Sequence, residues 1–352
     1  FYIHAAQISC RSDQPVNGGK DMGMLQSTLN RSRALPAMTG LFLLILTACG
    51  GGGGSSSSGV SPVSPPPPPP APVVTVQSDL VYGSNLTQSG AKTLTLDLYQ
   101  LDGTCDEPVP FVLGIHGGGF TGGSKTGGSW PSNLEAVAMR GYAGLSINYR
   151  LVSDEPVVSA EFQPLRDDLL AAADEIGLGD LQRAQANAAV AAFEDAVTAL
   201  DWVNENADLY CLDRDRFALW GSSAGAYIAL HVGHALDDYF IAHPEPLVVV
   251  DFWGALFAAE WLDTQGPPIM IVHGSDDLVV PYENALSLSA RAEETNLPYT
   301  FYTLDNVGHG TNIKQPQPDL GGETIETVTI DFIEAHLLGT QPLYEVKRLI
   351  QD

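Results

Sequence analysis

From about residue 73 onward, apolar residues fall into short runs separated by longer segments with helical spacing. Residues 93–99 alternate between apolar and polar side chains, which is typical of a half-buried strand. Continuous apolar runs, typical of buried parallel strands, occur at 111–115, 143–147, 216–220, 247–252, 269–272 and 299–304. Helical segments are expected between them, notably 188–207 and 224–235. Strands that alternate with helices predict an α/β protein with a mostly parallel sheet covered by helices on both faces.

The first part of the chain lacks this pattern. Residues 1–23 show no apolar periodicity, and we expect them not to belong to the mature protein. Residues 24–48 are typical of an export signal, because Arg31 and Arg33 precede an apolar run at 41–46. That run is far shorter than the roughly 20 apolar residues that span a bilayer.

The apolar run ends in Leu-Thr-Ala-Cys-Gly, which resembles the bacterial lipobox with Cys49 as the lipidated residue. An ordinary signal peptide with a coincidental cysteine is the alternative. Five glycines and four serines follow, and then six prolines at 65–70. A flexible coil followed by a stiff polyproline spacer predicts a tether over residues 49–72. The protein is therefore expected to be exported and anchored to a bacterial membrane by lipid alone, in the outer membrane if the cell is Gram-negative.

We expect one catalytic domain over residues 73–339 and a polar C-terminal tail over 340–352. The chain carries 42 acidic and 16 basic residues, a formal net charge of −26. This charge argues against nucleic acid, whose binding depends on Lys and Arg at the phosphates. It also argues against polyanionic substrates, which the overall field would repel. A neutral or apolar small substrate fits the composition better.

Residues 221–225 read Gly-Ser-Ser-Ala-Gly and match the pattern G-x-S-x-G between a predicted strand and a predicted helix. That context suits a nucleophilic serine, because flanking glycines let the chain turn sharply and the helix N-terminus faces developing negative charge. The glycine spacing selects Ser223 over Ser222. Another buried strand is followed by His-Gly-Gly-Gly at 116–119. We expect the backbone N–H groups of Gly117, Gly118 and Ala224 to bind an oxyanion there.

These two motifs resemble the α/β-hydrolase superfamily, in particular its carboxylesterase and hormone-sensitive-lipase-like branch with the His-Gly-Gly-Gly oxyanion motif. The resemblance extends over residues 73–339 and includes the strand-end segment Ser-Ile-Asn-Tyr-Arg at 146–150. It implies an α/β-hydrolase fold with a catalytic serine. Many relatives carry Asp or Glu directly before the nucleophile, whereas this chain has Ser222, which leaves the subfamily open.

A serine hydroxyl needs a histidine base, and the histidine needs a carboxylate to orient it. In this fold the acid follows the nucleophile and the histidine comes last. The segment 273–281 resembles the family's acid loop with its Asp at Asp277, and Asp276 is the competitor. His309, flanked by glycines after the last predicted strand, is the expected base.

Other histidines are expected to have structural roles. His231 and His234 are assigned to packing or the surface, and His116 and His273 to bracing loops by hydrogen bonds. No Cys and His cluster has metal-ligand spacing, and no phosphate-binding glycine motif opens a helix after a strand, so we expect no metal and no cofactor.

In the fold that the resemblance implies, the strands beginning near Phe111 and Phe217 are parallel neighbours. Cys105 and Cys211 each lie six residues before these positions, so a disulfide between them is predicted in an exported protein. Two separate buried thiols are the alternative. Residues 151–187 are too long for a plain connection, and they form either a partly helical cap over the acyl pocket or a solvated insertion.

The predicted function is a serine carboxylesterase acting on small to medium neutral esters through an acyl-enzyme. A carbohydrate or polyester esterase acting on extracellular polymers is the first alternative, and a peptidase or amidase ranks lower. An inactive hydrolase-fold binding lipoprotein is the alternative outside enzymes.

Overall fold

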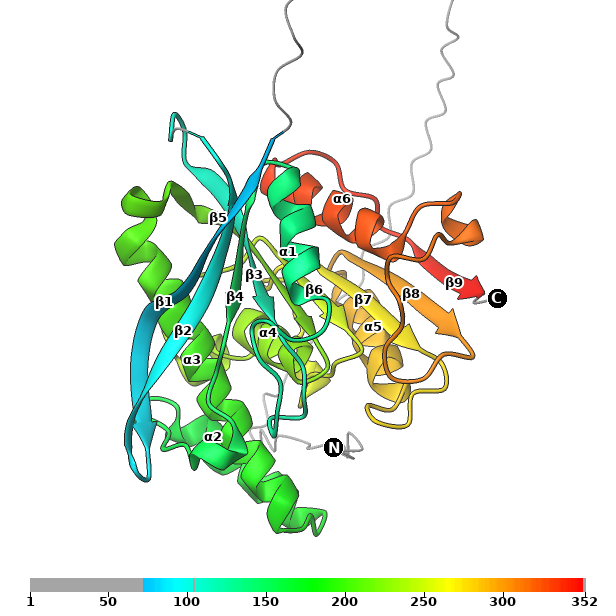
Figure 1. Cartoon of the computed structure of the whole chain (residues 1–352). Helices are drawn as coiled ribbons and strands as arrows, with labels where there is room; N and C mark the ends of the chain where they lie inside the picture. Colours follow the sequence, from blue (N-terminus) through cyan, green and yellow to red (C-terminus); the bar gives the residue numbers. More distant parts are fainter. Residues whose placement is uncertain (1–71, 104, 351–352) are drawn as a thin grey trace, which may run out of the picture. The chain divides into compact units, whose positions relative to one another are not determined.

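The computed structural model describes residues 72–103 and 105–350. The predicted signal peptide, Cys49 and the tether up to residue 71 lie outside these residues. Within the described residues, nine strands form one mixed sheet in the order β1-β2-β4-β3-β5-β6-β7-β8-β9 (Figure 1). The strands are β1 (Val74–Thr87), β2 (Gly90–Leu101), β3 (Val109–Ile115), β4 (Ala143–Ile147), β5 (Leu212–Ser222), β6 (Val248–Phe252), β7 (Ile269–Gly274), β8 (Tyr299–Asp305) and β9 (Val346–Ile350).

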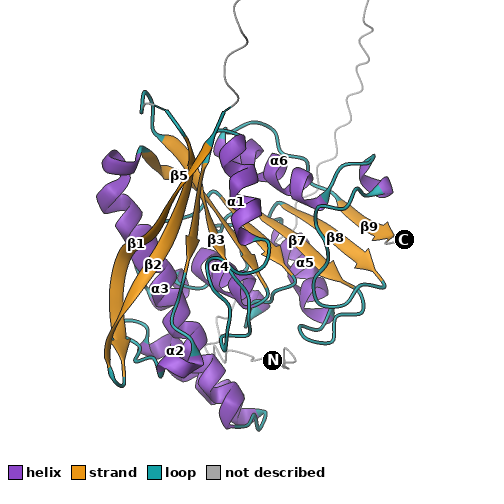
Figure 2. Cartoon of the chain, in the orientation of Figure 1, coloured by secondary structure: helices purple, strands orange, loops and turns teal. Residues whose placement is uncertain are grey.

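Strand β2 is antiparallel to both of its neighbours, and every pair from β4–β3 to β8–β9 is parallel. The longer helices are α1 (Trp130–Met139), α2 (Gln163–Glu175), α3 (Asp180–Tyr210), α4 (Ala224–His234), α5 (Glu283–Thr295) and α6 (Ile325–Leu337). Helices α1 and α6 pack on one face of the sheet, and α2 to α5 contribute to the core on the other (Figure 2). The α/β prediction with helices on both faces is therefore confirmed.

The seven strands expected from apolar runs are all present, but the two edge strands were not predicted. Strand β1 is mostly exposed, and its register against β2 shifts twice, between Gln77 and Leu80 and between Val81 and Gly83. These bulges interrupt the period of two on which a sequence pattern depends.

The prediction of a polar tail after residue 339 is wrong for its last part. Residues 346–350 form β9, which pairs in parallel with β8 at the sheet edge. Only Leu349 of this strand is fully buried, while Val346 and Ile350 are exposed. An edge strand with one buried side chain lacks the apolar run that marks a central strand, which is why the pattern missed it.

The predicted disulfide between Cys105 and Cys211 is present, with the two Cα atoms 5.6 Å apart. Strands β3 and β5 are parallel neighbours in which Phe111 lies opposite Phe217. The equal offsets are not the reason for the contact, because the register shifts between Val109 and Phe111 and places Val109 opposite Leu212. Cys211 directly precedes that pair, and its carbonyl accepts the N–H of Val109, so this irregular pairing brings the two cysteines together.

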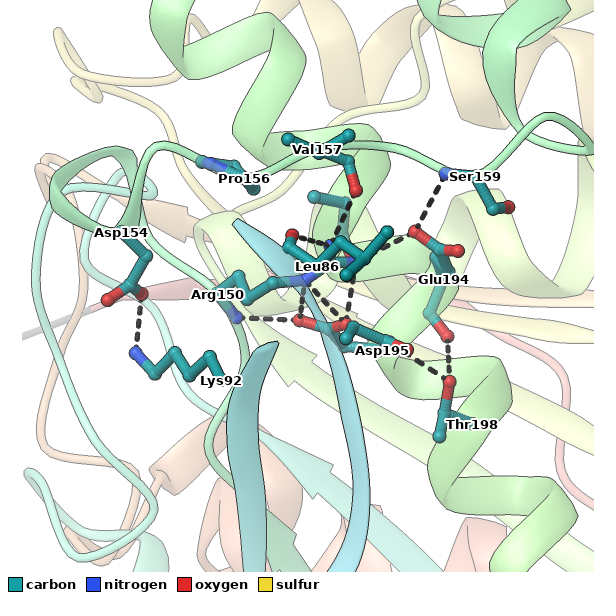
Figure 3. Close-up of polar contacts among 12 residues, drawn as sticks. Leu86, Lys92, Arg150, Asp154, Pro156, Val157, Ser159, Glu194, Asp195 and Thr198 are labelled. Carbon is teal, nitrogen blue, oxygen red and sulfur yellow. Dashed lines mark hydrogen bonds and ion pairs between the residues drawn. The ribbon is translucent and has the colours of Figure 1, made fainter. Parts of the chain in front are cut away.

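One buried cation connects the outer strands to the helical layer. Arg150 follows β4 and is fully buried (Figure 3). Its Nε donates to both carboxylate oxygens of Asp195 in α3, at 2.8 and 3.0 Å. Its terminal nitrogens donate to the carbonyls of Leu86 in β1, Val157 and Ala191, and to Glu194. A guanidinium can be buried at low cost when its donors are satisfied in this way.

Among the described residues, no helix combines the length and the apolar composition that a membrane span requires.

Replacing Arg150 by Met should lower the free energy of unfolding by about 3–5 kcal/mol, because Asp195 would stay buried without its cation. Urea denaturation of the purified protein measures this. Arg214→Met is the matched control, because Arg214 pairs with Asp208 at the surface and should contribute less than about 1 kcal/mol. Equal small losses in both variants would contradict the assigned role of Arg150.

Candidate active site

The candidate nucleophile sits on a tight turn between β5 and α4. Ser223 has φ 54° and ψ −122°, a left-handed conformation that side chains rarely adopt. A Cβ atom on Gly221 would collide with the backbone of Gly225, and one on Gly225 would collide with Ile115 in β3. Both glycines of the motif are therefore required by close backbone approach. The N–H of Ser223 donates to the carbonyl of Phe252 at 2.8 Å, which fixes the turn to β6.

The structure brings the three predicted side chains into one hydrogen-bonded row. His309 Nε2 lies 2.8 Å from Ser223 Oγ, and His309 Nδ1 lies 2.7 Å from Asp277 Oδ2. Asp277 is buried, whereas its competitor Asp276 is exposed and accepts a bond from the hydroxyl of Ser275. Since the imidazole faces the serine with one nitrogen and the carboxylate with the other, it can accept a proton from Oγ and stay oriented.

The carboxylate of Asp277 is held in its ionised form. Burial alone would raise its pKa, but hydrogen bonds from His273 and His309 outweigh burial. The backbone N–H groups of Val280 and Val279 add two more, at 3.0 and 2.8 Å. The pKa of Asp277 is therefore well below its ordinary range, and the group stays negative wherever an imidazole titrates.

The loop after β3 passes directly against the nucleophile. A Cβ atom on Gly117 would lie 2.8 Å from the carbonyl oxygen of Ser222 and 3.0 Å from Ser223 Cβ. The carbonyl of Gly118 accepts bonds from the N–H groups of Thr121 and Gly122, so the loop folds back on itself. Gly117, Gly118 and Ala224 lie on this loop and on the turn beside Ser223, and they remain the predicted oxyanion donors.

Contacts on the far side hold this loop in place. The hydroxyl of Tyr149 donates to the carbonyl of His116 at 2.8 Å, and the two rings stack with centroids 4.3 Å apart. His116 Nδ1 lies 2.7 Å from the carbonyl of Gly117. Burial lowers the pKa of His116 to about 4, so the ring is neutral at pH 7. This agrees with the prediction that His116 braces its loop.

Residues 151–187 are partly helical, as one of the two interpretations proposed. They contain a 3₁₀ turn at Val152–Asp154, helix α2 and the start of α3. Two hydrogen bonds connect this segment to the glycine loop: Val152 N–H donates to the carbonyl of Phe120, and Gln185 Nε2 to that of Gly119, both at 2.8 Å. Its role as a cap over the acyl pocket stays a prediction.

The remaining histidines have the structural positions expected of them. His231 and His234 are buried on α4, and His231 stacks on Phe193 with centroids 4.6 Å apart. His273 Nε2 lies 2.9 Å from the carbonyl of Val280 and therefore braces the acid loop. Among the described residues no group of three or more His, Cys, Asp or Glu side chains is arranged to hold a metal ion.

Three further residues of the site were not found from the sequence. Gln185 lies in a helix whose pattern gives no sign of its contact with Gly119. Trp253 follows β6 with φ 45°, and its ring packs edge-on against His309 at 6.5 Å. Asp251 is a fully buried acid inside the apolar strand β6. A charged residue in a buried parallel strand was the available signal.

The lowered pKa of Asp277 predicts a pH-dependent contribution to stability. A carboxylate whose pKa is lower in the folded than in the unfolded chain stabilises the fold above the unfolded value of about 3.9, and this stabilisation is lost as pH falls. The stability gap between wild type and Asp277→Asn, measured by urea denaturation, should therefore shrink from pH 7 to pH 3. Asp276→Asn, at the exposed competitor, is the matched control. A gap independent of pH for Asp277→Asn would contradict the assignment.

A BD-FAE family model matches residues 96–167 and 180–244, less than half of the chain. The matched residues include the glycine loop and Ser223. They omit 168–179, which hold the second part of α2 and the turn into α3.

The chain is 25% identical to dipeptidyl aminopeptidase BIII of Pseudoxanthomonas mexicana over 242 residues, which are 59% of this chain and 31% of that protein. It is 22% identical to Esterase LipC of Mycobacterium tuberculosis (strain ATCC 25618 / H37Rv) over 262 residues, 62% of this chain and 57% of that protein. The chain thus spans less than two thirds of either relative.

A solved structure described as a truncated form of a carbohydrate esterase from gut microbiota superposes with a TM-score of 0.53. The alignment covers 75% of this chain and 96% of that one at 16% identity, so it concerns the fold alone. With the strand order and the serine turn between β5 and α4, these matches show that the chain has the α/β-hydrolase fold.

Proposed function

We propose that this protein is a serine carboxylesterase that hydrolyses small to medium neutral carboxylic esters. The observation that carries the proposal is the row Ser223–His309–Asp277, with distances of 2.8 and 2.7 Å, set against a three-glycine loop. A serine activated by an oriented imidazole and placed beside a glycine loop is suited to acyl transfer.

The reaction follows from this geometry in two steps. Ser223 Oγ attacks the ester carbonyl carbon while its proton passes to His309 Nε2, and the carbonyl oxygen becomes an oxyanion facing the N–H groups of Gly117, Gly118 and Ala224. The oxyanion collapses, the alkoxide takes the proton from His309 and leaves as an alcohol, and the acyl group stays on Ser223. Water then attacks the acyl-enzyme with His309 as base, which releases the acid and restores the serine. Asp277 stays ionised and stabilises the imidazolium.

The net charge of the chain and the type of glycine loop favour a neutral ester as the substrate. The net charge of −26 disfavours anionic substrates. The glycine loop resembles that of esterases more than that of peptidases, which ranks amide hydrolysis lower even though one relative carries the name of an aminopeptidase. A polymer ester on a carbohydrate or polyester remains the alternative substrate, and the inactive binding lipoprotein the alternative outside enzymes.

Labelling with a fluorophosphonate probe, together with hydrolysis of p-nitrophenyl butyrate, tests the proposal. Wild-type protein should react with the probe and turn the ester over, while Ser223→Ala should not be labelled and should lose at least about 10⁴-fold in kcat. Ser222→Ala is the matched control, since the neighbouring hydroxyl has no part in the row, and it should keep its activity. A folded wild type that neither labels nor hydrolyses esters would refute the enzyme and favour the binding lipoprotein.

The substrate class is decided by comparing acetate release from acetylated xylan with turnover of p-nitrophenyl butyrate. A dipeptide p-nitroanilide added to the same assay reports peptidase activity.

We further propose that the protein is exported and anchored to a bacterial membrane through a lipid on Cys49. The lipobox-like segment before Cys49 and the Gly, Ser and Pro tether after it support this, as does a disulfide suited to an oxidising compartment. In a bacterial host fed an alkyne fatty acid, the wild-type chain should carry the label and Cys49→Ser should not. A label that persists in Cys49→Ser would contradict the proposal.

A further inference from the structure

Two buried polar side chains lie behind the acid of the catalytic row, on neighbouring strands. Asp251 is in β6 and His273 is in β7, and both are fully buried. Asp251 pairs with Ile271 in the parallel register, two residues before His273. Side chains alternate along a strand, so Asp251, Ile271 and His273 project from the same face, the one covered by α4 and α5.

His273 is oriented by two acceptors at one of its nitrogens. Its Nε2 lies 2.9 Å from the carbonyl oxygen of Val280 and 3.4 Å from Asp277 Oδ2. A nitrogen that faces a carbonyl and a carboxylate must carry the proton. Asp277 Oδ2 therefore lies between two imidazoles, those of His309 and His273.

The outer ends of the buried pair lack partners. Within the described residues, His273 Nδ1 and Asp251 Oδ2 each have no hydrogen-bond partner, although Asp251 Oδ1 accepts the N–H of Gly254 at 2.7 Å. An unpaired polar atom in the core is destabilising, because it has lost its hydrogen bonds to water and gained none in return. No hydrogen bond or ion pair joins these two atoms directly, so one water between them, through which they share a proton, would satisfy both atoms.

Charge considerations agree with a shared proton. Burial raises the pKa of Asp251 to about 6, and His273 and the N–H of Gly254 lower it only in part. Two further titratable groups face His273: Asp277, and Tyr282, whose ring lies 6.1 Å from that of His273.

We propose that Asp251 and His273 are positioning residues that extend the row Ser223–His309–Asp277 into the core, with Asp251 holding His273 so that its Nε2 donates to Val280 and Asp277. The inference rests on the proposed function. Asp251 also binds the loop after β6, because its Oδ1 accepts the N–H of Gly254. A Cβ atom on Gly254 would lie 2.6 Å from that oxygen, so the loop approaches Asp251 closely. The pair therefore connects the loop that carries Trp253 to the loop that carries Asp277.

Substitutions at Asp251 test the hydrogen bond. Asn can donate to the bridging water through its amide and accept from Gly254 through its oxygen, so Asp251→Asn should keep kcat within about twofold. Leu has a similar volume and no donor, so Asp251→Leu should lower kcat about tenfold with KM little changed, because a small displacement of a catalytic group reduces the rate of the chemical step. Rescue by Asn and not by Leu is the result expected, and equal kcat in both variants would overturn the proposal.

A double-mutant cycle shows whether the two residues act together. His273→Leu should lower kcat in a similar way, and adding Asp251→Leu to it should cost little more, since the first change already removes the shared proton. Full additivity of the two effects would contradict the pairing.

Two further measurements test the proposal without relying on folded Asp251 variants, and separate its failure from failure of the proposed esterase function. Nitrogen-15 NMR of the wild-type histidines, with His273 assigned by its loss in His273→Gln, should show a proton on Nε2 from pH 5 to pH 9. A ring protonated on Nδ1 alone would refute the proposal without any Asp251 variant. Fluorophosphonate labelling of the same samples reports the nucleophile, so an unlabelled wild type would refute the enzyme instead of the positioning pair.

Discussion

Two backbone segments, the turn between β5 and α4 and the end of β3 with its glycine loop, lie too close together at Ser223 for a Cβ atom on Gly225 or Gly117. The site depends on this close approach. The turn between β5 and α4 presses on the end of β3 at Gly225, and Gly117 presses back on Ser222 and Ser223. Since these segments leave neighbouring parallel strands, the sheet register sets their spacing. The left-handed conformation of Ser223 follows from the same crowding. Nucleophile and glycine loop are thus fixed by main-chain packing, and only the histidine and the acid depend on longer loops.

The second constraint is the cost of charge in the interior. Arg150, Asp195, Asp277 and Asp251 are all buried, and each lies at a junction between elements. Arg150 joins β1, the segment after β4 and α3, while Lys125 from the loop after the glycines forms ion pairs with Asp97 and Asp79. A buried charged side chain is stable only next to its hydrogen-bond or ion-pair partners, so each of these side chains restricts the relative positions of the elements that it joins. In this acidic protein, the buried cations Arg150 and Lys125 thus join elements that are distant in the sequence.

The sequence specified the central sheet and the catalytic row better than the edges of the molecule. Buried parallel strands need continuous apolar runs, and the serine turn needs glycines, so both can be recognised from a single sequence. The edge strands have weak sequence patterns, because β1 contains bulges and β9 buries a single side chain. The position of Asp277 in the acid loop favoured it over Asp276 as the catalytic acid. That Asp277 is buried and Asp276 is exposed could be known only from the folded loop. Gln185 and Trp253 act through tertiary contacts that have no local pattern.

Residues near Gln185 in the helical pair α2–α3 are constrained by the hydrogen bond from Gln185 to Gly119, whereas residues farther from it are less constrained in sequence and length. The part next to Gln185 shares a hydrogen-bonded framework with the glycine loop, through Gln185 itself and through Val152. In the outer part, residues 168–179, Leu169 and Ala173 are buried, whereas residues 174–177 are exposed. Asp168 contacts Tyr239 and Asp174 contacts Arg183. The family match also skips these outer residues. Insertions and deletions in the exposed turn at 174–177 can therefore accumulate over evolution without moving the backbone amides next to the nucleophile. The scaffold can change around the site while its chemistry stays constant.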